Sequence, residues 1–178
     1  MIQFRSSLLR YLLFAAVALV AFVAGVMMRT QPAEAPQLTG ADALLATRLL
    51  DLHDQPQRLD QWRGKVLVVN FWATWCAPCR EEIPIFVAMQ DQYRDKGLQF
   101  VGIAIDQVDK TREFATSFKI NYPTLMGGFD TVELSQQVGN SKRGLPFTVV
   151  LDRHGKIAST ELGGITREKL EALINPLL

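Results

Sequence analysis

Cysteine and histidine are scarce in this 178-residue sequence, which contains two of each. Two cysteines cannot build the multiple disulfides that stabilise many small secreted domains. His53 and His154 are far apart in the sequence, and neither forms the spaced pair that a zinc site with the two cysteines would need. We therefore expect no resident metal. The formal net charge is only +1, which excludes the strongly basic surface of a nucleic-acid-binding protein.

Acidic residues are absent from the first 29 positions, where Arg5, Arg10 and Arg29 flank an uncharged apolar run at Tyr11–Met28. As a helix with about 1.5 Å of rise per residue, this run would span roughly 27 Å, most of a bilayer core. The apolar region of a cleaved signal peptide covers about 7–15 residues, so the run favours an uncleaved anchor. Cleavage after the Ala-x-Ala pattern at Ala33–Ala35 is the alternative.

These features predict four parts of the chain. Residues 1–10 form a cytoplasmic amino terminus, 11–28 a transmembrane signal anchor, 29–40 a proline-containing linker and 41–178 a folded domain. Two arginines precede the apolar run and one follows it, which favours a cytoplasmic amino terminus. We therefore expect a single-pass protein of the inner (cytoplasmic) membrane, with its folded domain in the periplasm or another extracytoplasmic space.

The folded domain alternates strand and helix patterns. Nearly continuous apolar and β-branched runs predict strands at Lys65–Trp72, Leu98–Ile105, Tyr122–Met126 and Phe147–Leu151. Helices are predicted at Pro78–Lys96, from a cap at Asp109 to Lys119, at Thr131–Val138 and after a cap at Thr166. A hairpin at Leu49–Leu59 comes first, and Lys156–Glu161 pairs back antiparallel on the preceding strand. The order predicts an α/β fold with a helix-bearing insert.

Cys76 and Cys79 follow a predicted buried strand and open a predicted helix. A disulfide across so short a loop stabilises a fold only weakly, so a purely structural role is a poor explanation of the spacing. The helix dipole and the free N–H groups of the first turn favour a thiolate on the first cysteine. The second cysteine lies about one turn inward, within reach of a mixed disulfide. The pair is therefore predicted to be redox-active, with a structural disulfide and a metal site as alternatives.

The segment Val68–Cys79, with the sequence VVNFWATWCAPC, resembles the active-site stretch of the thioredoxin superfamily. It is most similar to the membrane-anchored TlpA/ResA/CcmG-like branch, and the similarity extends over residues 45–178. Pro84 matches the helix proline of the superfamily, and Gly144–Thr148 resembles the loop that carries its cis-proline. The segment Asp109–Met126 resembles the insert of this branch. The resemblance implies a thioredoxin-like fold with a central mixed sheet.

The resemblance also implies roles for individual residues. Cys76 would be the exposed nucleophile and Cys79 the resolving thiol. Pro146 would be cis and would place the Leu145 backbone beside the pair to hold an extended substrate, while Trp75 would form a substrate-facing wall.

Two positions concern proton handling. Asn70 stands where thioredoxins usually have a buried Asp, so that carboxylate is missing. Glu82 matches an acidic position of ResA-like proteins that tunes the thiols, because a nearby carboxylate raises thiol pKa values and relays protons. A solvated helix residue is the alternative for Glu82.

The implied activity is that of a protein-disulfide reductase acting on disulfide-bearing exported proteins, with the cysteine pair as its redox group and no other cofactor. Apocytochromes c or proteins with metal-site cysteines would be its clients, and a membrane protein of the DsbD/CcdA type its electron donor. Two other classes stay open. A redoxin-type thiol peroxidase would carry a Pro-x-x-x-Thr/Ser-x-x-Cys motif, which precedes neither cysteine here. A non-enzymatic, membrane-tethered chaperone or metal-handling adaptor would not need both cysteines.

Overall fold

The computed structural model describes residues 15–23 and 40–178. The expected cytoplasmic segment 1–10, residues 11–14 and 24–28 of the expected anchor and the linker up to residue 39 lie outside the described residues. Residues 15–23 are helical. Among the residues that the structure describes, none of the helices is both long and apolar enough to cross a membrane.

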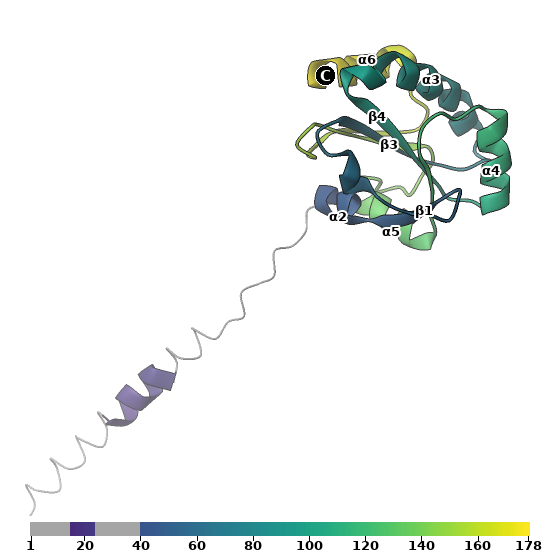
Figure 1. The fold of residues 1–178 in the computed structure, drawn as a ribbon. Helices are drawn as coiled ribbons and strands as arrows, with labels where there is room; N and C mark the ends of the chain where they lie inside the picture. The colour runs from purple at the N-terminus through teal and green to yellow at the C-terminus, as the bar shows by residue number, and fades with distance from the viewer. Residues whose placement is uncertain (1–14, 24–39) are drawn as a thin grey trace, which may run out of the picture. The chain divides into compact units, whose positions relative to one another are not determined.

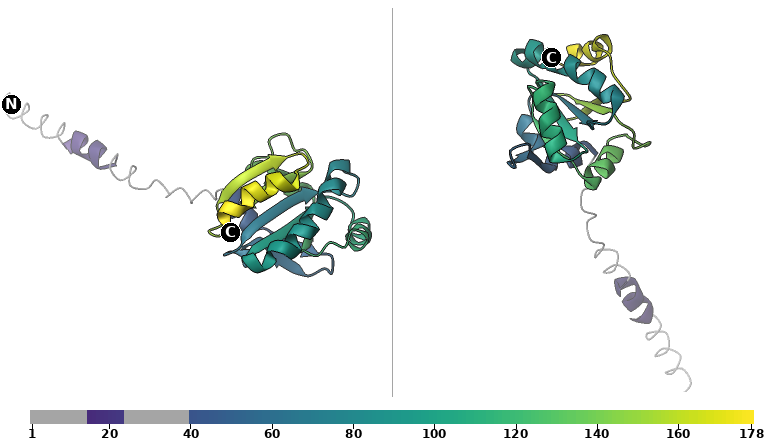
Figure 2. Two further views of the ribbon diagram at one scale, coloured as in Figure 1. Left: turned by 90° about the horizontal axis from the view of Figure 1, so that it is seen from above. Right: turned by 90° about the vertical axis from the view of Figure 1, so that its right-hand side faces the viewer.

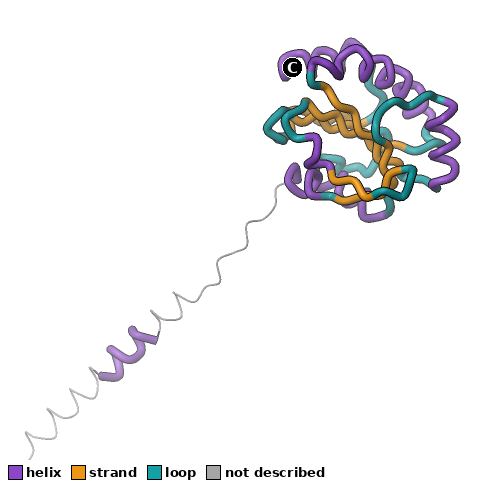
Figure 3. Tube along the Cα trace, viewed as in Figure 1, coloured by secondary structure: helices purple, strands orange, loops and turns teal. Residues whose placement is uncertain are grey.

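A seven-stranded mixed sheet forms the centre of the unit from residue 40 onward (Figures 1 and 3). Its strands, in order across the sheet, are β2 (Pro56–Arg58), β1 (Arg48–Asp51), β5 (Thr124–Met126), β4 (Leu98–Ala104), β3 (Val66–Trp72), β6 (Phe147–Leu151) and β7 (Ile157–Leu162). The β3, β4 and β5 strands run parallel, and the other neighbouring pairs are antiparallel. The β3 strand lies between β4 and β6 and its side chains enter a core on each face, so all of its residues are buried, as predicted.

Helices cover both faces of the sheet. They are α2 (Gly40–Ala46), α3 (Ala77–Tyr93), α4 (Val108–Ser117), α5 (Phe129–Gln137) and α6 (Arg167–Ile174), with short 3-10 turns η1 (Leu59–Trp62), η2 (Arg94–Lys96) and η3 (Asn175–Leu177). Helices α3 and α6 lie side by side on one face, and α2 and α5 lie on the other (Figures 1 and 2). Alternating side chains of β3 build both cores: Val66 and Val68 pack towards α3 and α6, and Leu67 and Val69 towards α2 and α5.

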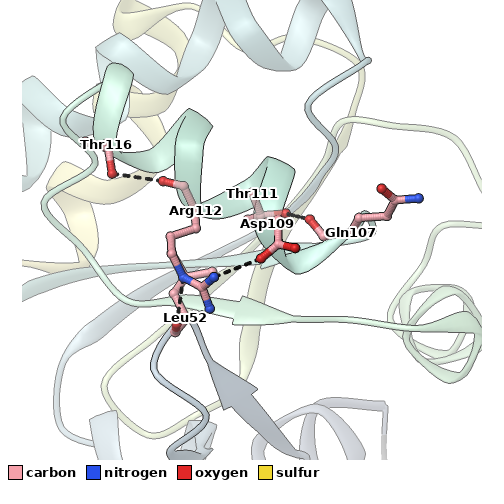
Figure 4. Close-up of polar contacts among 6 residues, drawn as sticks. All are labelled: Leu52, Gln107, Asp109, Thr111, Arg112 and Thr116. Carbon is pink, nitrogen blue, oxygen red and sulfur yellow. Dashed lines mark hydrogen bonds and ion pairs between the residues drawn. The ribbon is translucent and has the colours of Figure 1, made fainter.

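The insert helix α4 is attached to the N-terminal hairpin. The prediction that Asp109 caps this helix is wrong: Gln107 is the N-cap, so Asp109 lies in the first turn and instead accepts a hydrogen bond from Arg112. Arg112 also donates through Nε and Nη2 to the carbonyl oxygen of Leu52, at 3.3 and 3.0 Å (Figure 4). This residue thus links α4 to the turn of the hairpin.

The helix that carries the cysteines begins directly after the first of them. Cys76 is the N-cap of α3, and the helix ends at Tyr93 before the η2 turn. Gly97 then adopts φ 95°, a left-handed conformation that glycine accepts without steric cost, and ends the η2 turn as its C-cap. Thr166 accepts a hydrogen bond from the Lys169 N–H, which confirms it as the cap of α6.

Candidate active site

The redox pair lies where the central strand β3 passes into α3. Cys76 has an extended backbone (φ −84°, ψ 107°), and its carbonyl oxygen accepts the hydrogen bond of the Arg80 N–H. Cys76 and Cys79 form a disulfide with their Cα atoms 5.3 Å apart. Cys76 thus stands at the N-cap of α3, where the free N–H groups of the first turn and the helix dipole favour a thiolate after reduction.

The two sulfurs differ in accessibility. Cys76 is 5% exposed and Cys79 is fully buried. The resemblance implied an exposed Cys76, and this needs correction for the oxidised form, in which Cys76 packs in an apolar cluster with Ile83 and Phe114. Trp75, immediately before it, is 70% exposed. A partner sulfur can therefore approach Cys76 but not Cys79, across a surface that Trp75 borders.

The peptide bond between Leu145 and Pro146 is cis, as the resemblance implies. Leu145 packs against the cluster that contains both cysteines, and the Pro146 carbonyl oxygen accepts a hydrogen bond from the Gly163 N–H at 2.8 Å. In the part of the chain that the structure describes, the N–H and C=O of Leu145 make no hydrogen bond. A backbone segment next to the redox pair thus keeps a donor and an acceptor available for an extended peptide.

Glu82 is not a solvated helix residue, because it is only 1% exposed. It lies one turn after Cys79 on the buried side of α3. Its Oε1 accepts a hydrogen bond from Asn70 Nδ2 at 2.8 Å, and its Oε2 accepts one from the Ile165 N–H at 3.1 Å. Asn70 Nδ2 also donates to Thr148 Oγ1 at 3.0 Å. The carboxyl group, one turn after Cys79 on α3, is therefore held from two sides, by Asn70 on β3 and by the backbone at Ile165 before α6.

Burial raises the pKa of Glu82 from 4.5 to about 7, although the hydrogen bonds from Ile165 and Asn70 act to lower it. A surface pocket of about 350 Å³ borders Glu82 between Pro78 and Gly164 and gives solvent a route towards the carboxyl group. Because its pKa lies near neutrality, Glu82 can gain and lose a proton under physiological conditions. The geometry is therefore suited to moving a proton close to Cys79.

The loop before Cys76 is fixed by a carboxylate that the sequence analysis did not select. The N–H and Oγ1 of Thr74 both donate to Asp106 Oδ2, at 3.0 and 2.5 Å. Burial acts to raise the pKa of Asp106, but the hydrogen bonds from Thr74 and Gln107 prevail and lower it. Asp106 follows β4, whose carboxyl end lies beside that of the parallel strand β3. The sequence could have pointed to Asp106 through its place after β4, since side chains that follow neighbouring parallel strands meet at one edge of the sheet.

The insert also contacts the helix that carries the cysteines. The guanidinium of Arg80 in α3 lies 5.4 and 5.5 Å from the ring centroids of Phe114 and Phe118 in the insert.

The disulfide itself is the redox group that the site offers. Among residues 15–23 and 40–178, no group of three or more His, Cys, Asp or Glu side chains is arranged to hold a metal ion.

The sheet order, the cysteine pair at the start of α3 and the cis-proline beside it place the chain among the thioredoxin-fold thiol–disulfide oxidoreductases. The Redoxin family model matches residues 32–174, so the chain belongs to the Redoxin family. It is 31% identical to the thiol-disulfide oxidoreductase ResA of Geobacillus kaustophilus (strain HTA426) over 124 residues, which are 69% of each chain. It is 30% identical to the thioredoxin-like protein YneN of Bacillus subtilis (strain 168), over 69% of this chain and 71% of that one.

Solved structures agree with this assignment. A thiol:disulfide interchange protein of the thioredoxin family from Chlorobium tepidum TLS superposes with a TM-score of 0.69 at 25% identity, covering 82% of this chain and 99% of that one. A DsbF homologue from Corynebacterium diphtheriae gives a TM-score of 0.66 at 28% identity, covering 74% and 83%. The chain is thus a protein-disulfide oxidoreductase whose redox group is the Cys76–Cys79 pair.

Proposed function

We propose that this oxidoreductase works as a reductase of disulfides in exported proteins. The observation that carries the proposed direction is the buried carboxyl group of Glu82, one turn after Cys79. An ionised carboxylate disfavours a nearby thiolate and raises thiol pKa values. Since a stabilised thiolate makes a dithiol a better oxidant, a disfavoured thiolate makes it a better reductant.

The reaction begins with the reduced protein. The Cys76 thiolate attacks one sulfur of a client disulfide: a bond from Cys76 to the client forms, the client S–S bond breaks and a client thiolate leaves. Cys79 then gives its proton to the Glu82 carboxylate and attacks Cys76 Sγ, which releases the second client thiolate. The client gains two electrons, its two thiolates take up one proton passed on from Glu82 and one from solvent, and the Cys76–Cys79 disulfide is formed. A dithiol donor must then reduce this disulfide for another cycle.

Binding of the client is assigned to the surface around Cys76. Leu145 packs against the cluster that contains both cysteines, and its unpaired N–H and C=O would pair with an extended client segment. Trp75, 70% exposed, would pack against the client on the other side. These contacts are made to the backbone of the client more than to its side chains. The surface therefore suits a reductase with several clients.

We place the reaction outside the cytoplasm, with the protein held at the inner membrane by residues 11–28 and its amino terminus inside. The apolar run and the arginines that flank it support this placement. Thiols in such a compartment tend to become oxidised, so a reductase there needs electrons from across the membrane. A membrane dithiol donor of the DsbD/CcdA type fits this need, and apocytochromes c or proteins with metal-site cysteines fit the client role.

Mechanism-based trapping tests the proposal. Full-length Cys79→Ser, expressed in the native cell, retains the attacking thiol but cannot resolve the mixed disulfide, so clients accumulate bound to Cys76. Cys76→Ser/Cys79→Ser is the matched control. Recovery of exported proteins with paired cysteines by the single variant alone is the expected result. Failure to trap any protein, while the purified variant forms mixed disulfides with a model peptide, would refute the reductase role.

Two further measurements address the other classes. Rapid peroxide consumption that depends on Cys76 would identify a thiol peroxidase instead. Full complementation of a deletion strain by Cys76→Ser/Cys79→Ser would identify a non-enzymatic adaptor. The proposal predicts slow peroxide turnover and no complementation.

A further inference from the structure

Asn140 lies at the base of the loop that leads to the cis-proline. Its side chain is buried, with 2% exposed. Its Nδ2 donates to the carbonyl oxygen of Gly144 at 3.0 Å, and its Oδ1 accepts a hydrogen bond from the Gly144 N–H at 3.0 Å. The amide thus pairs with both backbone groups of one residue, as a neighbouring strand would. Gly144 directly precedes Leu145, whose free backbone groups face the client in the proposed function.

The same side chain is anchored on the core side of the loop. Asn140 Nδ2 donates to Ser135 Oγ at 3.1 Å, and the Asn140 N–H donates to the Ser135 carbonyl oxygen at 2.9 Å. Ser135 is buried in α5 and donates through Oγ to the carbonyl oxygen of Val132. Helix α5 packs into the core beneath the sheet through Leu134. Asn140 therefore connects a packed helix to the residue that precedes Leu145.

The tip of the loop supplies little restraint of its own. Ser141, Lys142 and Arg143 are exposed, and their side chains make no hydrogen bond or ion pair with another described residue. Arg143 has φ 52°, in the left-handed region that non-glycine residues rarely adopt, and its N–H donates to the Asn140 carbonyl oxygen at 3.0 Å. Apart from the bond from the Ser141 N–H to the Gly139 carbonyl oxygen, the hydrogen bonds within this loop involve Asn140.

We propose that Asn140 is a positioning residue for the client: its amide sets the place of the Leu145 backbone relative to Cys76. This inference rests on the proposed role of Leu145 in binding clients. It predicts that client alignment and the redox properties of the cysteine pair can be changed separately. A shift of Leu145 changes how well a peptide aligns with Cys76, whereas the disulfide and Glu82 are held by α3 and β3. Misplacing a reactant by about 1 Å is enough to slow a reaction by orders of magnitude.

The test compares Asn140→Asp and Asn140→Ala with the control Asn121→Asp. The Asp side chain keeps the size of Asn140 but loses its donor and brings a carboxylate oxygen against the Gly144 carbonyl. Asn121 also donates through Nδ2 to a carbonyl oxygen, that of Val87, but it is exposed and lies outside this loop. Ser135→Ala removes one of the bonds of the Asn140 side chain, together with the bond from Ser135 Oγ to the Val132 carbonyl oxygen, and serves if the Asn140 variants fail to fold.

Three quantities are measured on the full chain. They are the rates of thiol–disulfide exchange with a CxxC peptide in both directions, the reduction potential of the pair, and the alkylation rate of reduced Cys76 by iodoacetamide, which needs no backbone pairing. We expect the Asn140 variants to exchange with the peptide about 10-fold more slowly in both directions, with a higher KM, because the peptide is misaligned. The rate of Cys76 alkylation should remain within about twofold of the wild-type rate, and the reduction potential should be unchanged, since neither depends on the alignment of the peptide.

Unchanged peptide exchange in folded Asn140 variants would overturn the inference. It would also be overturned by equal losses in peptide exchange and alkylation, which would show a purely structural role. Failure of the wild type to reduce the peptide, with normal exchange in the oxidising direction, would refute the reductase proposal alone, and the comparison of variants would then be decided in that direction.

Discussion

Asn70 Nδ2 lies 2.8 Å from Glu82 Oε1, so a side-chain amide is the immediate neighbour of the buried carboxyl group. An amide carries both a donor and an acceptor, and the Oδ1 of this one has no hydrogen-bond partner among the described residues. It can donate to the Glu82 carboxylate, or rotate by 180° and accept from the carboxylic acid. The hydroxyl of Thr148, its second neighbour, can reverse in the same way. Asn70 therefore suits a carboxyl group that changes its protonation during the reaction.

The stability of the oxidised protein should depend on the protonation of Glu82. Its pKa is raised from 4.5 to about 7 in the fold, so between these values the folded state binds more protons than the unfolded state. The free energy of unfolding consequently falls as the pH rises from 4.5 through 7, by about 3 kcal/mol from this group. Urea unfolding at intervals from pH 4.5 to pH 8 measures the slope, and Glu82→Gln should remove it. The exposed neighbour Glu81→Gln is the control, and parallel profiles for wild type and Glu82→Gln would refute this origin.

Glu82 should also influence the thiols of the reduced protein. Above pH 7 its negative charge disfavours a thiolate nearby, so Glu82→Gln should lower the pKa of the Cys76 thiol. Thiolate absorbance or the pH dependence of alkylation provides the titration curve. Glu81→Gln again serves as the control. Superimposable curves for wild type and Glu82→Gln would remove Glu82 from the site.

Replacing Asn70 by a carboxylate should make the site strongly pH-dependent. In Asn70→Asp two acidic groups face each other within hydrogen-bond distance, and they cannot both ionise without a large penalty. We expect this variant to lose more than about 2 kcal/mol of stability between pH 5 and pH 8 beyond the wild-type loss. The double variant Asn70→Asp/Glu82→Gln carries only one carboxyl group and should recover most of that loss. A single variant that follows the wild-type profile would show that the two side chains do not interact.

The sequence predicts the redox centre better than its surroundings. The strands at Val66–Trp72, Leu98–Ala104 and Phe147–Leu151 are buried on both faces, so their apolar residues are continuous and easy to detect. The cysteine pair is recognisable because both its spacing and its place at a helix start are local. Helix α2 was not predicted, since its seven residues include only two that are buried, Leu44 and Leu45, too few for a periodic pattern.

Contacts between distant residues explain the remaining omissions. Thr148 reaches Asn70 only because β6 pairs antiparallel with β3 in the register that sets these residues opposite each other. Glu82 directly follows two charged residues, Arg80 and Glu81, and only the packing of α3 against the sheet shows that it is buried. Asn140 appears as a polar loop residue until the course of its loop is known. Such contacts depend on register and packing, which composition and periodicity do not contain.

The contact between Thr74 and Asp106 should stabilise the loop before Cys76 in a pH-dependent way. Asp106 accepts two hydrogen bonds from Thr74, and its pKa lies below the ordinary value of 3.8. Its contribution is therefore fully present above pH 3.8 and is lost as the pH falls through the lower pKa of the folded state. Asp106→Ala should destabilise the protein by about 2 kcal/mol at pH 7, because the two Thr74 donors and the Gln107 N–H lose a charged partner, and Thr74→Val by about 1 kcal/mol.

Urea unfolding at pH 7 and at pH 3 measures these effects, and the cost of Asp106→Ala should shrink at the lower pH. Asp109→Asn is the matched control, because its contact with Arg112 is a largely exposed ion pair, and such pairs contribute about 1 kcal/mol or less. These bonds hold Thr74, which directly precedes Trp75 and Cys76 in the chain. Asp106→Ala should therefore slow peptide exchange at pH 7 by more than Asp109→Asn does. Equal stabilities and equal exchange rates for the two aspartate variants would mean that Asp106 does not hold the loop. Lower stability with unchanged exchange would limit Asp106 to a structural role and leave the position of Cys76 to the start of α3 alone.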